Sequence, residues 1–118
     1  MFEKMIEISM LYDFYGQLLT AKQRELLKLY HEDNYSLSEI AEEYNISRQG
    51  VHDAVKKAEK ALHEYESKLG LIRKFTATEE AIGKIDGGIN RLMQENSQNK
   101  HLTEKLKQIK TIIDRINE

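Results

Sequence analysis

The sequence predicts an all-α protein, and three observations support that prediction. The 118 residues include no proline and only six glycines, so few positions interrupt a helix. Apolar residues recur at intervals of three and four over most of the chain. No segment alternates apolar and polar residues for long enough to predict a strand.

The composition excludes several classes of protein. Without cysteine, the chain cannot form disulfides, a catalytic thiolate or a cysteine-ligated zinc site. No apolar run approaches the roughly 20 residues that span a bilayer, and two glutamates among the first ten residues argue against a signal peptide. We therefore expect a cytoplasmic protein without membrane insertion. The formal net charge of −2 also lacks the strongly basic balance typical of many nucleic-acid-binding proteins.

Two helices are expected before residue 33. The apolar face of the first helix stops near Gly16, which we expect to cap its C-terminus. Thr20 and Gln23 have the spacing of a capping box, which predicts a second helix that ends near Glu32. The expected apolar face of the first helix consists of Phe2, Met5, Ile6, Ser9, Leu11 and Phe14.

A short helix and a long helix are expected next. Ser36 and Glu39 form a second capping box, and Asn45 follows where the chain needs a left-handed residue for a tight turn. Ser47 is placed to cap the long helix, which Gly70 ends. Its apolar stripe has alternating spacings of four and three and consists of Val51, Val55, Ala58, Leu62, Tyr65 and Leu69.

Residues 36–55 have the pattern of a helix-turn-helix. Ala41 is small where the two helices would cross, and Asn45 occupies the turn. The buried faces are expected to be Ile40, Tyr44, Ile46, Val51 and Val55. The outward side chains at the start of the second helix would then enter a major groove, where Arg48 can pair with guanine and Gln49 with adenine.

The candidate nucleic-acid-binding residues gather on that second helix. They are Ser47, Arg48, Gln49, His52, Asp53, Lys56, Lys57 and Lys60. Residues 20–69 nevertheless hold 8 basic and 10 acidic side chains, and DNA affinity depends largely on neutralising phosphates. We therefore expect weak DNA binding, and a protein-interaction role for the trihelical unit remains an alternative.

A helical arm is expected after the helix-turn-helix. Thr76 and Glu79 suggest a third capping box, although the glycines at 83, 87 and 88 weaken the helix that follows. A polar segment at 95–100 precedes a last helix that is too short to be stable alone. The expected stripes are Ile82, Ile85, Ile89 and Leu92, then Leu102, Leu106, Ile109, Ile113 and Ile116.

These patterns divide the chain into a helix-turn-helix domain at 1–75, with its core at 20–69, and an arm at 76–118. The last helix must pack within the chain or against a second copy, and the second possibility favours a homodimer. The four histidines lack the spacing of a helical metal site, and no phosphate-binding glycine loop is present. We expect no enzymatic activity and no cofactor.

Residues 18–66 resemble region 4 of bacterial sigma factors. The resemblance rests on the segments LTAKQRELLKLY, SLSEIAEEYNIS and ISRQGV, but the chain has no upstream region 2 and few basic residues in the reading helix. Together with the N-terminal MLYDFYGQLLTAKQ, the whole chain resembles the YlxM family, also described as p13-like DNA-binding proteins. The likeness is strong over residues 1–75 and only general in the arm.

The resemblance implies a function in protein targeting. That family is encoded beside the signal recognition particle GTPase and its receptor in Gram-positive bacteria. It implies a DNA-binding regulator linked to this pathway or, alternatively, an accessory protein that binds the particle's RNA or its GTPase. The residues that match the family's motif are Asn45, Ser47, Arg48, Gln49, Val51 and His52, and none is catalytic.

The charge is distributed unevenly along the chain. Residues 1–69 hold 9 basic and 13 acidic side chains, whereas residues 70–118 hold 9 and 7. The arm therefore carries the cationic surplus, and its basic residues are expected to assist any nucleic-acid binding. They are Arg73, Lys74, Lys84, Arg91 and the basic cluster at 100–110.

Overall fold

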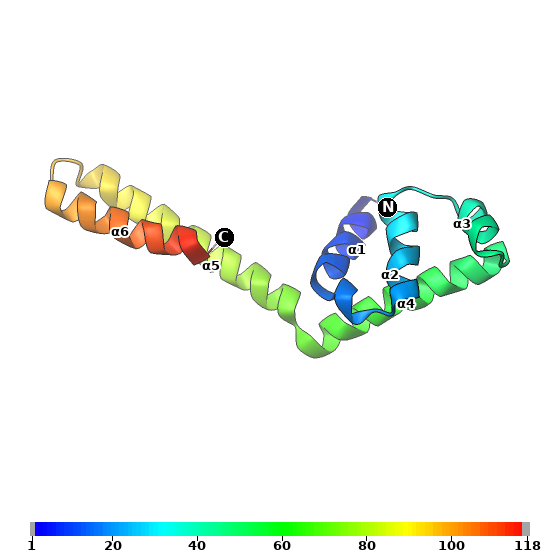
Figure 1. Ribbon diagram of the computed structural model, residues 1–118. Helices are drawn as coiled ribbons and strands as arrows, with labels where there is room; N and C mark the ends of the chain where they lie inside the picture. The colour runs from blue at the N-terminus through cyan, green and yellow to red at the C-terminus, as the bar shows by residue number, and fades with distance from the viewer. Residues whose placement is uncertain (1, 117–118) are drawn as a thin grey trace. The chain divides into compact units, whose positions relative to one another are not determined.

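The computed structural model describes residues 2–116, and every regular element among them is helical (Figure 1). The α-helices are α1 (Phe2–Tyr15), α2 (Ala21–Leu27), α3 (Leu37–Tyr44), α4 (Arg48–Leu69), α5 (Leu71–Glu95) and α6 (Lys100–Ile116). The all-α prediction is confirmed. The chain forms two compact units, the first ending at Ile72 and the second beginning at Arg73.

Both capping boxes predicted before residue 40 are present. The Thr20 hydroxyl accepts a hydrogen bond from the Gln23 amide, and the Gln23 side chain accepts one from the Thr20 amide, each at 3.1 Å. Ser36 and Glu39 make the same reciprocal pair at 3.1 and 3.0 Å. Each box satisfies amides that a helix start leaves without partners, so α2 and α3 begin where the sequence predicts.

The first helix ends where expected but buries a different face. Ile8, Leu11 and Tyr15 are buried, whereas Met5 and Ile6 are about half exposed. The side chain of Phe2 lies outside the part of the chain that the structure describes. The predicted cap is also wrong, because the chain continues after Tyr15 as a 3-10 turn, Gly16–Leu18, and the φ angle of its glycine is not positive.

Helix α4 is the centre of the first unit. α1, α2 and α3 each pack against it, as Figure 1 shows. Four residues of its predicted stripe are buried, whereas Leu69 is 53% exposed because it lies beyond the helices that cover the stripe. The buried cluster of this unit consists of Ile8, Leu11, Tyr15, Leu19, Leu26, Leu27, Ile40, Ala41, Val51, Val55, Ala58 and Leu62.

The turn of the helix-turn-helix has the predicted backbone. Asn45 adopts the left-handed conformation with φ 54°, and its amide donates to the Ala41 carbonyl. Ala41 is buried at the crossing, as expected, but Ile46 is 38% exposed rather than buried. The side chain of Ile46 follows the turn directly, where α3 and α4 diverge and no third element covers it.

A network of hydrogen bonds joins the ends of α1 and α4 to the start of α5. The Tyr15 hydroxyl donates to the Glu66 carboxylate and accepts from the Leu71 amide at 3.0 Å. Glu66 also accepts from the Ile72 amide at 3.0 Å, and Gly70 makes the turn at φ 62°. These side chains satisfy the first free amides of α5.

The same network overturns the predicted third capping box. Thr76 lies inside α5, which has already begun at Leu71. The left-handed Gly70 ends α4 and turns the chain within one residue. No helix breaker separates Leu71 from Thr76, so the new helix starts at once, and Glu79 occupies an interior position.

The second unit is an antiparallel hairpin of α5 and α6 (Figure 1). The polar turn between them is confirmed, and Asn99 caps α6 by accepting from the Leu102 amide at 3.1 Å. The packing of α6 within the chain, left open by the sequence, is therefore observed against α5. Only four of the nine predicted stripe residues are buried, and they form the core: Ile82, Ile89, Leu106 and Ile113.

The Tyr15 network yields a prediction for stability. Tyr15→Phe removes the hydroxyl, so Glu66 loses one of its hydrogen-bond donors and the Leu71 amide loses its acceptor. Losing such a hydrogen bond should lower the thermal midpoint by about 4–8 °C in a domain of this size. Tyr12→Phe is the control, because that hydroxyl is exposed and its bond to the Arg24 carbonyl is 3.5 Å long. Equal midpoints for the two variants would contradict the assignment.

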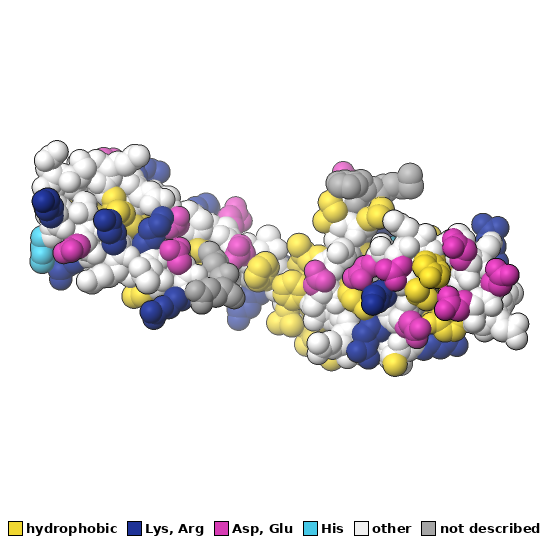
Figure 2. All heavy atoms as spheres, turned by 45° about the horizontal axis from the view of Figure 1, so that its top comes forward, with side chains coloured by type: hydrophobic (Ala, Val, Ile, Leu, Met, Phe, Trp, Pro, Cys, Tyr) yellow, Lys and Arg dark blue, Asp and Glu magenta, His cyan; other side chains and the backbone are white. Residues whose placement is uncertain are grey.

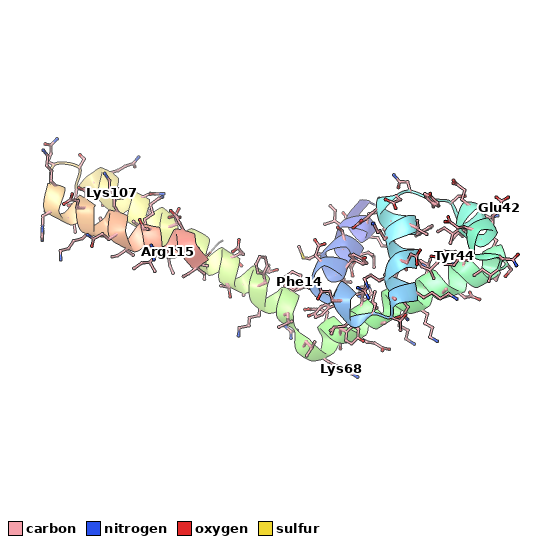
Figure 3. The ribbon with its side chains drawn as sticks, viewed as in Figure 1. Phe14, Glu42, Tyr44, Lys68, Lys107 and Arg115 are labelled. Carbon is pink, nitrogen blue, oxygen red and sulfur yellow. The ribbon has the colours of Figure 1, made fainter. Side chains whose placement is uncertain are left out.

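Tyr44, labelled on α3 in Figure 3, yields a prediction about pH. Burial, with Glu25 nearby as the next cause, raises the pKa of Tyr44 to about 12 from 10.0. Its buried hydroxyl reaches no described residue in hydrogen-bond geometry. The folded state thus holds this proton more tightly than the unfolded chain, and its stabilising contribution is lost as pH rises from 10 to 12.

Tyr44→Phe should therefore cost no stability near neutral pH, because no hydrogen bond is lost. Between pH 10 and 12 the wild type should lose more unfolding free energy than the variant does, as measured by urea denaturation. Tyr35→Phe, in the loop before α3, is the matched control. A parallel decline of wild type and Tyr44→Phe across this pH window would refute the prediction.

Candidate nucleic-acid interface

The structure brings all the candidate nucleic-acid-binding residues to the N-terminal half of α4 and its cap. The buried side of this helix faces the core through Val51 and Val55, which leaves the polar side in solvent. Every candidate is exposed: Ser47, Arg48, Gln49, His52, Asp53, Lys56, Lys57 and Lys60. They therefore form one continuous surface on a rigid helix.

Ser47 shapes this surface. Its hydroxyl accepts a hydrogen bond from the Gly50 amide at 2.9 Å and so caps α4. A Cβ at Gly50 would lie 3.1 Å from that hydroxyl, which is closer than ordinary packing. Gly50 is thus part of the cap that positions Arg48 and Gln49, and the sequence reasoning missed it.

Asp53 organises the exposed side chains around it. The Gln49 amide nitrogen donates to the Asp53 carboxylate at 2.9 Å. The His52 ring nitrogen lies 3.5 Å from the same carboxylate oxygen. Asp53 therefore orients two candidate reading residues, and it also places a negative charge among them, which opposes an approaching phosphate.

Lys56 is directed differently from the other lysines. Its ammonium lies 3.6 Å from the carboxylate of Glu59, a residue that is only 6% exposed. Lys57 and Lys60 form no ion pair with the described residues and remain available for phosphates. Glu59 was not singled out from the sequence, although its place between Val55 and Leu62 of the buried stripe is a usable signal.

The electrostatics of the first unit disfavour strong attraction to a polyanion. Residues 1–72 hold 9 basic and 13 acidic side chains, and Glu39, Glu42 and Glu43 are exposed on α3 beside the turn. Figure 2 shows acidic side chains spread among the basic ones on the visible face of this unit. A ligand must therefore gain affinity from specific contacts rather than from net charge.

Residues 2–116 contain neither a metal-binding cluster nor a membrane-spanning helix. No group of three histidine or carboxylate side chains in that range is arranged to hold a metal ion. No helix in the described part of the chain has the length and apolar character needed to cross a membrane. The exposed side of α4 is thus the surface that the sequence motif predicts and that the structure leaves accessible.

Comparison with known proteins identifies the family. The family model described as "Putative helix-turn-helix protein, YlxM / p13 like" matches residues 2–109. A UPF0122 protein of Listeria innocua is 39% identical over 112 residues, covering 95% of this chain and 99% of the relative. A UPF0122 protein of Bacillus thuringiensis is 41% identical over 117 residues, covering 99% and 100%. This chain therefore belongs to UPF0122, the YlxM/p13-like helix-turn-helix family.

Proposed function

We propose that this protein is a non-enzymatic regulator that binds DNA through the exposed side of α4. The observation that carries the proposal is the start of that helix. Asn45 in the left-handed conformation makes the turn, and Ser47 caps the helix that follows. Arg48 and Gln49 are therefore exposed in the first turn of α4. In helix-turn-helix proteins the first turns of the second helix contact base edges in the major groove.

The roles of the side chains follow from their positions. Arg48 and Gln49 are suited to bidentate contacts with guanine and adenine, and Lys57 and Lys60 to phosphates along the flank. Four cations, Arg48, Lys56, Lys57 and Lys60, limit the number of phosphates that this surface can neutralise. For each copy of this surface on the DNA, its own contribution to the slope of log K against log salt should therefore be no steeper than about −3.6.

The biological setting of the proposal is the signal recognition particle pathway, which the family resemblance implies. The alternative is that the same fold binds the particle's RNA or its GTPase. Within this alternative, one observation favours the RNA over the GTPase as the partner. The basic surplus lies in residues 73–118, and Lys107 and Arg115 project from α6 (Figure 3). Such a surface supplies the phosphate attraction that the first unit lacks.

Fluorescence anisotropy with purified components tests the proposal. The probes are duplexes from the promoter of the protein's own operon, an unrelated duplex, and the signal recognition particle RNA. Arg48→Ala should weaken binding to the specific duplex by about 1–3 kcal/mol, because it removes a bidentate base contact. Asp53→Asn should strengthen binding to all duplexes, because it removes a negative charge from the interface.

Lys68→Ala is the matched control, since Lys68 is an exposed cation at the far end of the same helix. It should leave duplex binding unchanged. Specific binding to the particle's RNA, unaffected by Arg48→Ala, would support the alternative. If no duplex binds at low salt, the DNA proposal is wrong.

We also propose that the protein is a homodimer joined through the second unit. The α5–α6 hairpin buries only four residues, a small core for two helices. On one side of the hairpin, Lys110 of α6 bridges to α5, because its ammonium donates to Asp86 at 3.3 Å and to Asn90 at 3.0 Å. Apart from Phe75, five large apolar residues in the described part of the second unit remain exposed: Ile85, Leu92, Ile109, Ile112 and Ile116.

These exposed residues share one face of the hairpin. Ile85 precedes the buried Ile89 by four positions, and Ile109 precedes the buried Ile113 by the same interval. On both α5 and α6, the exposed apolar residues are therefore rotated about the helix axis in the same sense from the buried ones. Because the two helices run antiparallel, equal displacement places both stripes on the same side.

This face has the form of half a four-helix bundle. A shallow hollow of about 500 Å³ lies beside Ile85, Gly88 and Leu92. A Cβ at Gly88 would meet nothing within 4 Å, which leaves room for a side chain of a partner. Arg91 and Glu95 also line this hollow, so the apolar residues form a strip with charged side chains beside it. Such a strip can pack against its own copy about a two-fold axis, and this packing would bury the exposed apolar residues of both copies.

Ile112→Ser tests the dimer. Ile112 is 60% exposed, so the substitution should leave the fold intact but weaken dimerisation by at least about tenfold. Sedimentation velocity over a range of concentrations gives the dissociation constant. Ile6→Ser, at a residue of the first unit that is 52% exposed, should not change it. A wild-type protein that sediments as a monomer at every concentration would rule out the dimer.

A further inference from the structure

The first unit contains a cavity of about 460 Å³ that the helix-turn-helix motif does not explain. It lies among α1, α4 and the segment that links α2 to α3. Its apolar wall includes Met5, Tyr30, Tyr35, Leu37 and Val55. Its volume falls within the range of small-molecule sites, about 300–1,000 Å³.

The backbone is irregular where it forms one wall of this cavity. The segment Lys28–Glu32 is a π-helical turn, closed by a hydrogen bond of 3.0 Å from the Asp33 amide to the Lys28 carbonyl. Asn34 then adopts a left-handed conformation with φ 57°. Such turns are rare and are frequent at functional sites, and this one carries Tyr30 and His31 into the wall.

A buried carboxylate lines the same cavity. Glu59 is 6% exposed, and one of its oxygens lies 2.8 Å from the His31 ring nitrogen. The other oxygen lies 3.6 Å from the Lys56 ammonium. A carboxylate has about four acceptor positions, so these two contacts leave capacity for a ligand that donates hydrogen bonds. Burying a carboxylate is costly unless its oxygens have partners, and His31 supplies a short contact to Glu59, at 2.8 Å.

Two lysines from different helices meet beside the cavity. Lys4 of α1 and Lys56 of α4 both line it. Contact with the Lys56 amine lowers the pKa of Lys4, with the charge of Glu59 opposing this effect. Because both lysines line one cavity, an anion bound there could contact the two cations together.

We propose that this cavity binds a nucleotide, with its phosphate at Lys4 and Lys56 and its base against Tyr30 and Tyr35. Tyrosine rings suit a flat aromatic ring, and lysines suit a phosphate. The spare acceptors of Glu59 suit the N–H groups on the edge of a base. A nucleotide, either free or unpaired within a strand, combines a flat ring, N–H donors on the edge of that ring and a phosphate.

The site overlaps the proposed DNA contact at two residues. His52 and Lys56 line the cavity and also belong to the candidate nucleic-acid interface. A bound nucleotide would therefore occupy two side chains of that interface. Lys4 belongs to the cavity alone, so its substitution separates the two sites.

Heteronuclear NMR titration of the full chain tests the nucleotide site. The probes are the four ribonucleoside 5′-monophosphates, the matching nucleosides and inorganic phosphate. At least one monophosphate should bind and shift the amides of Tyr30, His31 and Tyr35, whereas its nucleoside and phosphate should bind at least about tenfold more weakly. Lys4→Gln should weaken monophosphate binding by at least about tenfold, because it removes a charged contact to the phosphate.

Lys68→Gln is the matched control, since this exposed lysine of α4 lies outside both the cavity and the candidate nucleic-acid interface and should leave monophosphate binding unchanged. A single-stranded trinucleotide with the preferred base distinguishes the source: tighter binding than the monophosphate identifies an unpaired nucleotide in a strand, and equal or weaker binding a free nucleotide.

The proposal is overturned if no monophosphate binds at concentrations up to about 1 mM. It is also overturned if Lys4→Gln and Lys68→Gln weaken binding equally, since that result would indicate general attraction to cations. The duplex-binding assay and the monophosphate titration test different proposals. Arg48→Ala should leave monophosphate binding intact, and Lys4→Gln should leave duplex binding intact, so failure of one proposal does not imply failure of the other.

Discussion

The hydrogen bond from Tyr15 to Glu66 is the interaction on which the first unit depends. It joins the end of α1 to the last turns of α4, and both side chains also satisfy the first amides of α5. Burial, followed by the contact with Glu66, raises the pKa of Tyr15, so the hydroxyl remains a donor at physiological pH. Tyr15 has no exposed surface, and it belongs to the same buried cluster as the apolar side of α4.

Helix α4 serves two purposes because its two sides differ in chemistry. Its apolar side supplies the centre of the core, and its polar side carries the candidate nucleic-acid interface. Two acidic residues complicate that division. Asp53 holds Gln49 and His52 in place but adds negative charge, and Glu59 is buried beside His31 where an apolar residue would pack more cheaply. Acidic groups kept at positions where they lower affinity or stability are the features that most require a functional explanation.

Features that depend on neighbouring residues were predictable from the sequence. The boxes at Thr20–Gln23 and Ser36–Glu39, the left-handed Asn45 and Gly70, and the cap at Ser47 each depend on contacts within four residues, and all are observed. The box at Thr76–Glu79 has the same local pattern but is absent. A contact from Tyr15, far away in the chain, starts α5 before that signal is reached. Local rules fail where a distant side chain satisfies the same backbone groups.

The sequence by itself determined the helical class, most helix boundaries and the residues that α4 presents, because periodicity and capping are local properties. Only the tertiary structure decided which side of α1 is buried, that Ile85 and Ile109 stay outside the hairpin core, and that Lys4, His31, Lys56 and Glu59 meet at one cavity. Apolar spacing specifies that a helix has a face but not which partner covers it. That choice, like the meeting of charged side chains from separate helices, depends on how the helices pack.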